Sequence, residues 1–184
     1  MGPGDRMLLD LNRLHGPREH VERTFGPAAF DPQDEDYRVA APVDLSMDVH
    51  KLGEDAFRVT GRALTRLEMD CSRCVEPFQI PVEAAFDLQY VPHDHNSGEG
   101  EREIEDEDLS TAYYRDGALD IIDLLREQFQ LALPMKPLCA EDCRGLCPAC
   151  GANLNGTDCS CAQKWEDPRL TALKGLVYRD KENS

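Results

Sequence analysis

The stretch that decides the fold is FRVTGRALTRLEMDCSRCVEPFQIPVEAAFDLQY, residues 57–90. In each half, residues alternate with a period of two, which is typical of a β-strand with one buried face. The positions expected on that face are Phe57, Val59, Gly61, Ala63, Thr65, Leu67 and Met69, and then Phe78, Ile80, Val82, Ala84, Phe86, Leu88 and Tyr90. Because the connection at residues 70–77 is short, the stretch predicts a long antiparallel hairpin with two cysteines at its tip.

The segments on both sides extend this pattern. Before the hairpin, a third strand is predicted from the alternation of Val43, Leu45, Met47 and Val49 with polar residues. After it, residues 113–117 suit a short strand and a turn, and a helix capped by Asp120 follows and ends at Pro134. Its apolar positions are Ile121, Leu124, Leu125 and Phe129, so the helix is expected to pack across the sheet.

The chain contains eight cysteines, which form four close pairs. The pairs are Cys71 with Cys74, Cys139 with Cys143, Cys147 with Cys150, and Cys159 with Cys161. Two thiolates at Cys-x-x-Cys spacing reach one tetrahedral ion, and the glycine after Cys150 permits a tight turn around sulfur. No apolar run suits a signal peptide or a membrane span, so we expect a cytoplasmic protein without a membrane anchor. Paired thiols in a reducing compartment favour zinc over disulfides.

Spacing leaves the division of the thiolates open. We favour one ion held by Cys147, Cys150, Cys159 and Cys161, with a second held by Cys71, Cys74, Cys139 and Cys143. A competing division gathers residues 139–150 into one local site and leaves the last pair for the hairpin tip. In a third interpretation only one ion binds, and Cys71 and Cys74 are then the weakest pair, because Val75 follows them in place of glycine.

The sequence therefore predicts an α+β fold with two parts. Residues 1–134 form an antiparallel β core with one helix and an acidic loop at about 91–110. Residues 135–184 form a cysteine-rich zinc module packed on that core, and the module ends in a short helix that begins at Asp167 and Pro168.

The formal net charge is −16 and the pI is near 4.6, which is the wrong sign for clamping a nucleic-acid backbone over a broad surface. The acidic residues concentrate in residues 31–36 and 99–108. Such runs are typical of solvated loops, and an acidic surface also attracts a basic partner. Arg62, Arg66 and Arg73 lie on or near the strand that leads to the hairpin tip, where they could form a local basic patch. They are candidate contacts for RNA or a partner. The alternative is a wet strand face with cross-strand ion pairs to Glu68, Glu83 or Asp87.

We do not expect an enzyme. A catalytic zinc keeps an open coordination position, whereas paired sulfurs would close the shell. The sequence also contains no glycine-rich phosphate loop and no nucleophile elbow, so no small-molecule substrate is expected.

The order of these elements resembles the YceD family. The resemblance rests on the hairpin with Cys71-Ser-Arg-Cys74, the helix that runs into Leu133-Pro-Met-Lys-Pro137, the string Gly145-Leu-Cys-Pro-x-Cys-Gly151, and Asp167-Pro-Arg-Leu170. Members of this family are described as large ribosomal RNA subunit accumulation proteins. The resemblance implies a part in the synthesis, processing or stability of 23S rRNA. Expected partners are then a large ribosomal subunit precursor, 23S rRNA or a basic ribosomal protein. The alternative is a zinc-binding adapter or regulator unrelated to ribosomes.

Overall fold

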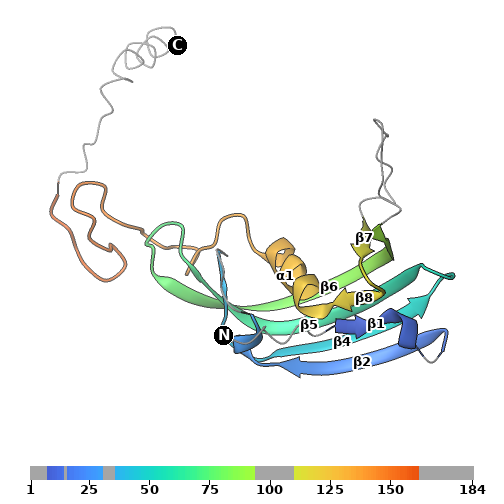
Figure 1. Ribbon diagram of the computed structural model, residues 1–184. Helices are drawn as coiled ribbons and strands as arrows, with labels where there is room; N and C mark the ends of the chain where they lie inside the picture. Colours follow the sequence, from blue (N-terminus) through green and yellow to red (C-terminus); the bar gives the residue numbers. More distant parts are fainter. Residues whose placement is uncertain (1–7, 15, 31–35, 94–109, 162–184) are drawn as a thin grey trace, which may run out of the picture. The chain divides into compact units, whose positions relative to one another are not determined.

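The computed structural model describes residues 8–14, 16–30, 36–93 and 110–161 (Figure 1). The strands are β1 (Leu8–Asp10), β2 (Arg18–Phe25), β3 (Arg38–Val39), β4 (Val43–Lys51), β5 (Phe57–Asp70), β6 (Pro77–Pro92), β7 (Thr111–Tyr114) and β8 (Ala118–Asp120). Two 3₁₀ turns, η1 (Leu11–Arg13) and η2 (Pro27–Ala29), and one helix, α1 (Ile121–Ala132), complete the described elements. Within the described residues no helix is long and apolar enough to cross a membrane.

The chain forms two compact units, and their boundary differs from the one that the sequence suggested. The first unit comprises Met1–Asp70 and Pro77–Pro137, and the second comprises Cys71–Glu76 and Leu138–Ser184. The hairpin tip thus groups with the cysteine module rather than with the strands that carry it. The reason is local, because residues of the tip lie beside cysteines that follow residue 138.

The first unit is built on a mixed sheet with the strand order β2-β4-β5-β6-β7, and β3 also pairs with β5. The predicted hairpin is present: β5 and β6 pair antiparallel from Phe57↔Tyr90 to Asp70↔Pro77. The sheet is antiparallel as predicted except at β7, which pairs parallel with β6. A parallel neighbour needs a long connection, and residues 93–110 provide one. A separate two-stranded sheet pairs β1 with β8.

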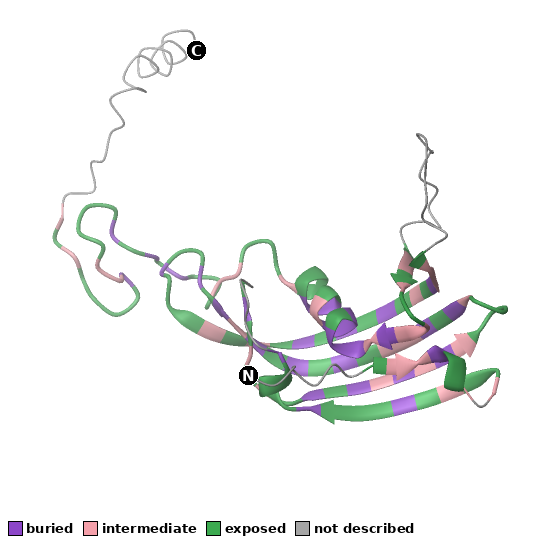
Figure 2. Ribbon diagram, viewed as in Figure 1, coloured by how far each residue is buried: buried purple, intermediate pink, exposed green. Residues whose placement is uncertain are grey.

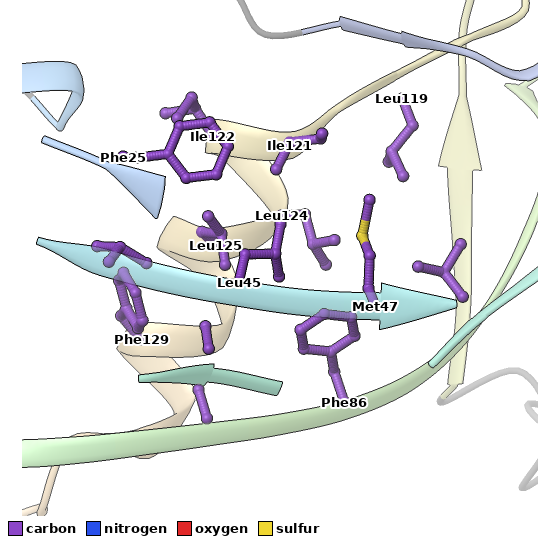
Figure 3. Close-up of a cluster of buried hydrophobic side chains, with 14 of the residues drawn as sticks. Phe25, Leu45, Met47, Phe86, Leu119, Ile121, Ile122, Leu124, Leu125 and Phe129 are labelled. Carbon is purple, nitrogen blue, oxygen red and sulfur yellow. The ribbon is translucent and has the colours of Figure 1, made fainter. Parts of the chain in front are cut away.

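The core lies between one face of this sheet and α1 (Figure 3). Burial alternates along β4 and β5, as Figure 2 shows, and the buried set of the sheet includes Val43, Met47, Val59 and Leu67. The Asp120 carboxylate accepts hydrogen bonds from the Ile122 and Asp123 amides, so it caps α1 as predicted. The four predicted apolar positions of α1 are all buried, at 2% exposure or less.

At Gly61 the neighbouring strands leave no room for a side chain. Gly61 pairs with Met47 on β4 and with Phe86 on β6. A Cβ atom at Gly61 would lie 2.6 Å from the Met47 Cβ and 2.7 Å from the Ser46 carbonyl oxygen. The strands can therefore approach this closely only because residue 61 has no side chain.

Two sequence predictions lie mainly outside the described residues. The acidic loop is described only at its ends, at residues 91–93 and at Ser110. The predicted C-terminal helix from Asp167 falls wholly outside them.

Candidate metal centre

Four cysteines from two separate segments of the second unit form what we call the hairpin cluster. Cys71 and Cys74 come from the hairpin tip, and Cys139 and Cys143 come from the segment after the first unit. Their four Sγ atoms all lie within 4.8 Å of one another. The Sγ atoms of Cys71 and Cys143 are 3.8 Å apart, and those of Cys74 and Cys139 are 3.7 Å apart. Three of the four cysteines are buried, and only Cys139 is exposed.

The other four cysteines form what we call the loop cluster. Cys147, Cys150, Cys159 and Cys161 again place all Sγ atoms within 4.8 Å of one another. The Cys159 Sγ lies 3.4 Å from that of Cys150 and 3.5 Å from that of Cys147. This cluster is more open, because Cys147 alone is buried.

The geometry of both clusters fits a tetrahedral metal ion. A Zn–S bond of about 2.3 Å places the sulfurs of a regular tetrahedron about 3.8 Å apart. The sulfur separations of 3.4–3.8 Å are close to that value. They are much longer than a disulfide bond of about 2.05 Å, and all eight cysteines are free. The structure thus groups the thiols in the division that the sequence favoured, with room for two ions.

The two Cys-x-x-Cys turns have the same pattern of backbone hydrogen bonds. At the hairpin tip, Cys71 N donates to Glu76 O at 3.0 Å and Val75 N donates to Cys71 O at 2.9 Å. In the loop cluster the corresponding bonds are Cys147 N to Ala152 O and Gly151 N to Cys147 O, both 2.8 Å. The residue after the second cysteine has a left-handed backbone in both turns, with φ of 60° at Val75 and 73° at Gly151.

The thiols of the hairpin cluster differ in their readiness to ionise. Burial raises the pKa of Cys71, but backbone N–H donors around its sulfur outweigh burial and lower that pKa to about 6. Although Cys139 is exposed, desolvation of its sulfur within the cluster, together with the neighbouring sulfurs, raises the pKa of Cys139 to about 12. One thiolate therefore forms easily near neutral pH, whereas four thiolates side by side repel one another.

The loop cluster likewise contains a thiol with a lowered pKa and a thiol with a raised pKa. Backbone N–H groups of Cys150 and Ala149 lower the pKa of Cys147 to about 6. Hydrogen bonding with the sulfurs of Cys159 and Cys150 raises the pKa of Cys161 to about 12. A divalent cation would remove the repulsion in each cluster and displace the remaining protons. Four sulfurs would fill a tetrahedral shell, which is typical of a structural site.

The supporting residues of these clusters were not predicted from the sequence. The Asn155 side chain donates from Nδ2 to the Cys143 Sγ at 3.3 Å and accepts at Oδ1 from Arg144 N at 2.7 Å. The Arg73 guanidinium donates to the carbonyl oxygens of Cys143, at 2.8 Å, and Glu141, at 3.3 Å. The only sequence signal was the turn-forming composition of residues 153–158, Asn-Leu-Asn-Gly-Thr-Asp.

The arginines proposed for RNA contact lie in different surroundings. Arg62 and Arg66 are exposed on the face of β5 that points away from α1. Arg73 belongs to the second unit, where it makes the bonds just described. Farther along β5, Arg58 forms a two-pronged ion pair with Asp87 on β6, with N–O distances of 2.8 and 2.6 Å. At Arg58 the cross-strand ion pair that the sequence offered as an alternative is therefore present.

A family model matches most of the chain. Residues 59–177 match the family model described as large ribosomal RNA subunit accumulation protein YceD. The matched range includes all but the first two residues of the hairpin and all eight cysteines.

Similar proteins occur in plants and bacteria. A maize (Zea mays) protein named large ribosomal RNA subunit accumulation protein YCED homolog 1, chloroplastic, is 30% identical over 73% of this chain and 53% of its own length. An uncharacterized Mycobacterium tuberculosis H37Rv protein is 32% identical over 62% of this chain and 52% of its own length. The protein YlbN of Bacillus subtilis strain 168 is 27% identical over 69% of this chain and 67% of its own length.

The chain spans about half the length of the first of these relatives. No solved structure matches it. The family model, in contrast, covers most of the chain, from the second strand of the predicted sheet to beyond the last cysteine. The chain therefore belongs to the YceD family of large ribosomal RNA subunit accumulation proteins.

Proposed function

We propose that this protein is a non-catalytic ribosome-biogenesis factor that supports the synthesis, processing or stability of 23S rRNA. The observation that carries the proposal is the family match over residues 59–177. The name of the maize relative describes that protein, and this chain spans about half of its length. Its role in ribosomal RNA accumulation is inferred from membership in the family.

The thiolate clusters support a structural rather than a catalytic role. Four sulfurs on each ion would leave no position for a substrate or an activated water. We propose zinc as the ion, because soft thiolate ligands in a tetrahedral arrangement are typical of structural zinc sites. Metal analysis of the purified protein tests this, and we expect two zinc ions per chain. A cytoplasmic location stays a prediction, since the maize relative is named as chloroplastic.

An acidic depression on the first unit supports a basic ribosomal protein as the partner. Its volume is about 640 Å³, and it lies beside the end of α1. Asp36, Glu68 and Asp70 provide three carboxylates along its lining, against one guanidinium from Arg38. The apolar part includes Leu133 and the fully exposed Met135. Lysine and arginine side chains can place their aliphatic stems on such apolar atoms and their charges beside carboxylates. The net charge of −16 favours the same kind of partner.

RNA within a large-subunit precursor is the other proposed contact, through Arg62 and Arg66 of the first unit. Both side chains are exposed on the same face of β5. Replacing both by glutamate should release the protein from large-subunit precursors in co-sedimentation while leaving the fold intact. Lys51→Glu, an exposed charge change on β4, is the matched control. Unchanged co-sedimentation would refute this contact and favour the acidic depression.

The decisive experiment on function is depletion of the protein in its own cells. We expect the ratio of mature 23S to 16S rRNA to fall, and expression of the wild-type chain to restore it. Mapping of the precursor ends then separates a processing defect from loss of stability. A normal ratio with normal precursor ends would refute the ribosomal proposal.

The second candidate is a zinc-binding adapter unrelated to ribosomes. The observation that favours it is the pair of closed thiolate clusters, which are the kind of site that adapters use to hold small interaction modules. A depleted strain with normal ribosomal RNA, together with two bound zinc ions in the purified protein, would support this alternative.

A further inference from the structure

The second unit contains a direct connection between its two thiolate clusters. Asn155 lies in the segment between Cys150 and Cys159, which are both in the loop cluster. Its side-chain amide nevertheless donates to the Sγ of Cys143, which is in the hairpin cluster. The loop of one candidate metal site thus places a hydrogen-bond donor on a ligand of the other.

The position of this amide is fixed by the surrounding backbone. Arg144 N donates to the Asn155 Oδ1 at 2.7 Å, so the Nδ2 end is the one that faces Cys143. The Asn155 amide N donates in turn to the Asn153 Oδ1 at 3.0 Å. Leu154 N donates to Gly145 O at 2.9 Å, which joins the two strands of this small loop just before Asn155.

The same loop is also joined to the hairpin tip. Leu146 N donates to Arg73 O at 3.1 Å, and the Asn153 side chain donates to the Glu76 carboxylate at 3.3 Å. Gly145 permits the first of these contacts, because a Cβ atom there would lie only 3.0 Å from Arg73 O. The backbone of Gly145 is left-handed, with φ of 73°, which glycine adopts without strain.

We propose that the two thiolate clusters bind metal cooperatively and that Asn155 is the positioning residue that couples them. An ion in the loop cluster joins Cys150 to Cys159 and thereby closes both ends of the segment that carries Asn155. The conformational entropy of that segment is then already lost, so forming the hydrogen bond from Asn155 to Cys143 costs less free energy. A thiolate bound to metal is a charged acceptor, so a preset N–H donor stabilises the loaded hairpin cluster. By linkage, an ion in the hairpin cluster strengthens binding at the loop cluster by the same factor.

The inference rests on the metal binding proposed above, and cadmium provides the probe. Cadmium NMR of the full chain should give one resonance for each site, and Cys159→Ser/Cys161→Ser should retain only that of the hairpin cluster. Occupancy of the hairpin cluster is followed against a competing chelator. We expect Asn155→Ala to weaken cadmium binding there by about 10- to 100-fold, the usual effect of losing a ligand's outer partner, and to move that resonance.

Cys159→Ser/Cys161→Ser should weaken the hairpin cluster about as much as Asn155→Ala does. Combining the two changes should cost little more than either alone, because Asn155 acts through the closed loop. Thr157→Ala, on the same loop, is the matched control and should leave both resonances unchanged. Asn155→Asp keeps the acceptor for Arg144 N but replaces the donor by a charged oxygen beside the Cys143 thiolate, so it should weaken the hairpin cluster at least as much as Asn155→Ala.

Two results would overturn the coupling while leaving metal binding intact. One is a cadmium affinity of the hairpin cluster that stays within about twofold of the wild-type value in both Asn155→Ala and Asn155→Asp. For comparison, the expected tenfold loss of affinity equals about 1.4 kcal/mol. The other is full additivity of the Asn155→Ala and Cys159→Ser/Cys161→Ser effects. A chain that takes up no cadmium at either cluster would overturn the metal proposal itself, and the coupling with it.

Discussion

The turn at residues 71–75 and the turn at residues 147–151 carry the same pair of backbone hydrogen bonds, but valine follows the second cysteine in one and glycine follows it in the other. Gly151 adopts its left-handed backbone without a steric penalty. Val75 is β-branched, and the same backbone costs it on the order of 1–2 kcal/mol. The strands β5 and β6 pair as far as Asp70 and Pro77, directly on either side of the Val75 turn. A long hairpin thus imposes at one turn the conformation that the local sequence favours at the other.

Removing the metal should produce the largest difference between the two turns. Structural zinc contributes roughly 10–16 kcal/mol in small zinc-dependent modules, so a strong chelator should unfold residues 138–161. The first unit has its own core and should stay folded. Hydrogen exchange should show β4 and β5 still protected, and the Val75 amide more protected than the Gly151 amide. Equal loss of protection at the two amides would refute the supporting role of the hairpin.

The pH dependence of metal affinity should be alike in the two clusters. Backbone donors lower the pKa values of Cys74 and Cys150, but the other effects together are larger. Burial and the neighbouring thiols raise the pKa of Cys74 overall, and the neighbouring thiols raise that of Cys150. Together with Cys139 and Cys161, each cluster then holds at least two protonated thiols near neutral pH. Metal-loaded protein binds fewer protons, so affinity should rise with pH, by at least about 100-fold per unit where two or more protons are displaced. Competition with a chelator at roughly neutral pH, from about 6.5 to 8, measures how steeply the metal affinity of each cluster rises with pH. If the metal affinity of one cluster did not change with pH, the two clusters would not be alike in the protonation of their thiols.

Gly151→Val should destabilise the loop turn by about 1–3 kcal/mol, because it puts a β-branched residue into a left-handed backbone that no long hairpin supports. Thermal unfolding of the second unit with saturating zinc measures this loss. Gly156→Val is the matched control, since a Cβ atom there meets nothing within 4 Å and its φ is not positive. A loss of similar size in both variants would point to glycine flexibility in general rather than to the turn.

Val75→Gly should have the smallest effect and the opposite sign. It relieves the strain of the valine but adds backbone entropy to the unfolded chain, so a gain below about 1 kcal/mol is expected. Val75→Ala keeps a Cβ atom in the left-handed backbone and should gain less. A loss of stability in Val75→Gly would mean that the exposed valine side chain makes a stabilising contact in the folded protein.

The sequence predicts the centre of the sheet because its buried strands show a clear period of two. It does not predict β2, where Val21 and Phe25 are the only buried residues and stand four positions apart. As an edge strand, β2 pairs with β4 along only one side, and its charged residues lie at the surface. The parallel pairing of β7 was missed for a different reason, since strand direction depends on the path of the connection and not on the residues of the strand.

The candidate site was predicted more fully than its supporting residues. Close cysteine pairs at metal-ligand spacing leave few divisions, and the favoured one agrees with the sulfur positions. The roles of Asn155 and Arg73 depend on how a loop folds back on itself, which has no periodic signal. Arg73 was expected among the RNA contacts, whereas its guanidinium donates to two backbone carbonyls of the cysteine module.

The separation of the cysteines along the chain has a consequence for the speed of folding. Sulfurs that meet in the loop cluster are 9 and 12 residues apart, whereas those that meet in the hairpin cluster are 65 and 72 apart. Closing a ten-residue loop takes on the order of 10–100 ns, and longer closures are slower and entropically more costly. The loop cluster should therefore form early and by itself, and the hairpin cluster should form only after β5 and β6 have paired. Newly made chains would then pass through a state with one site assembled, in which the thiols of Cys71 and Cys74 are still free.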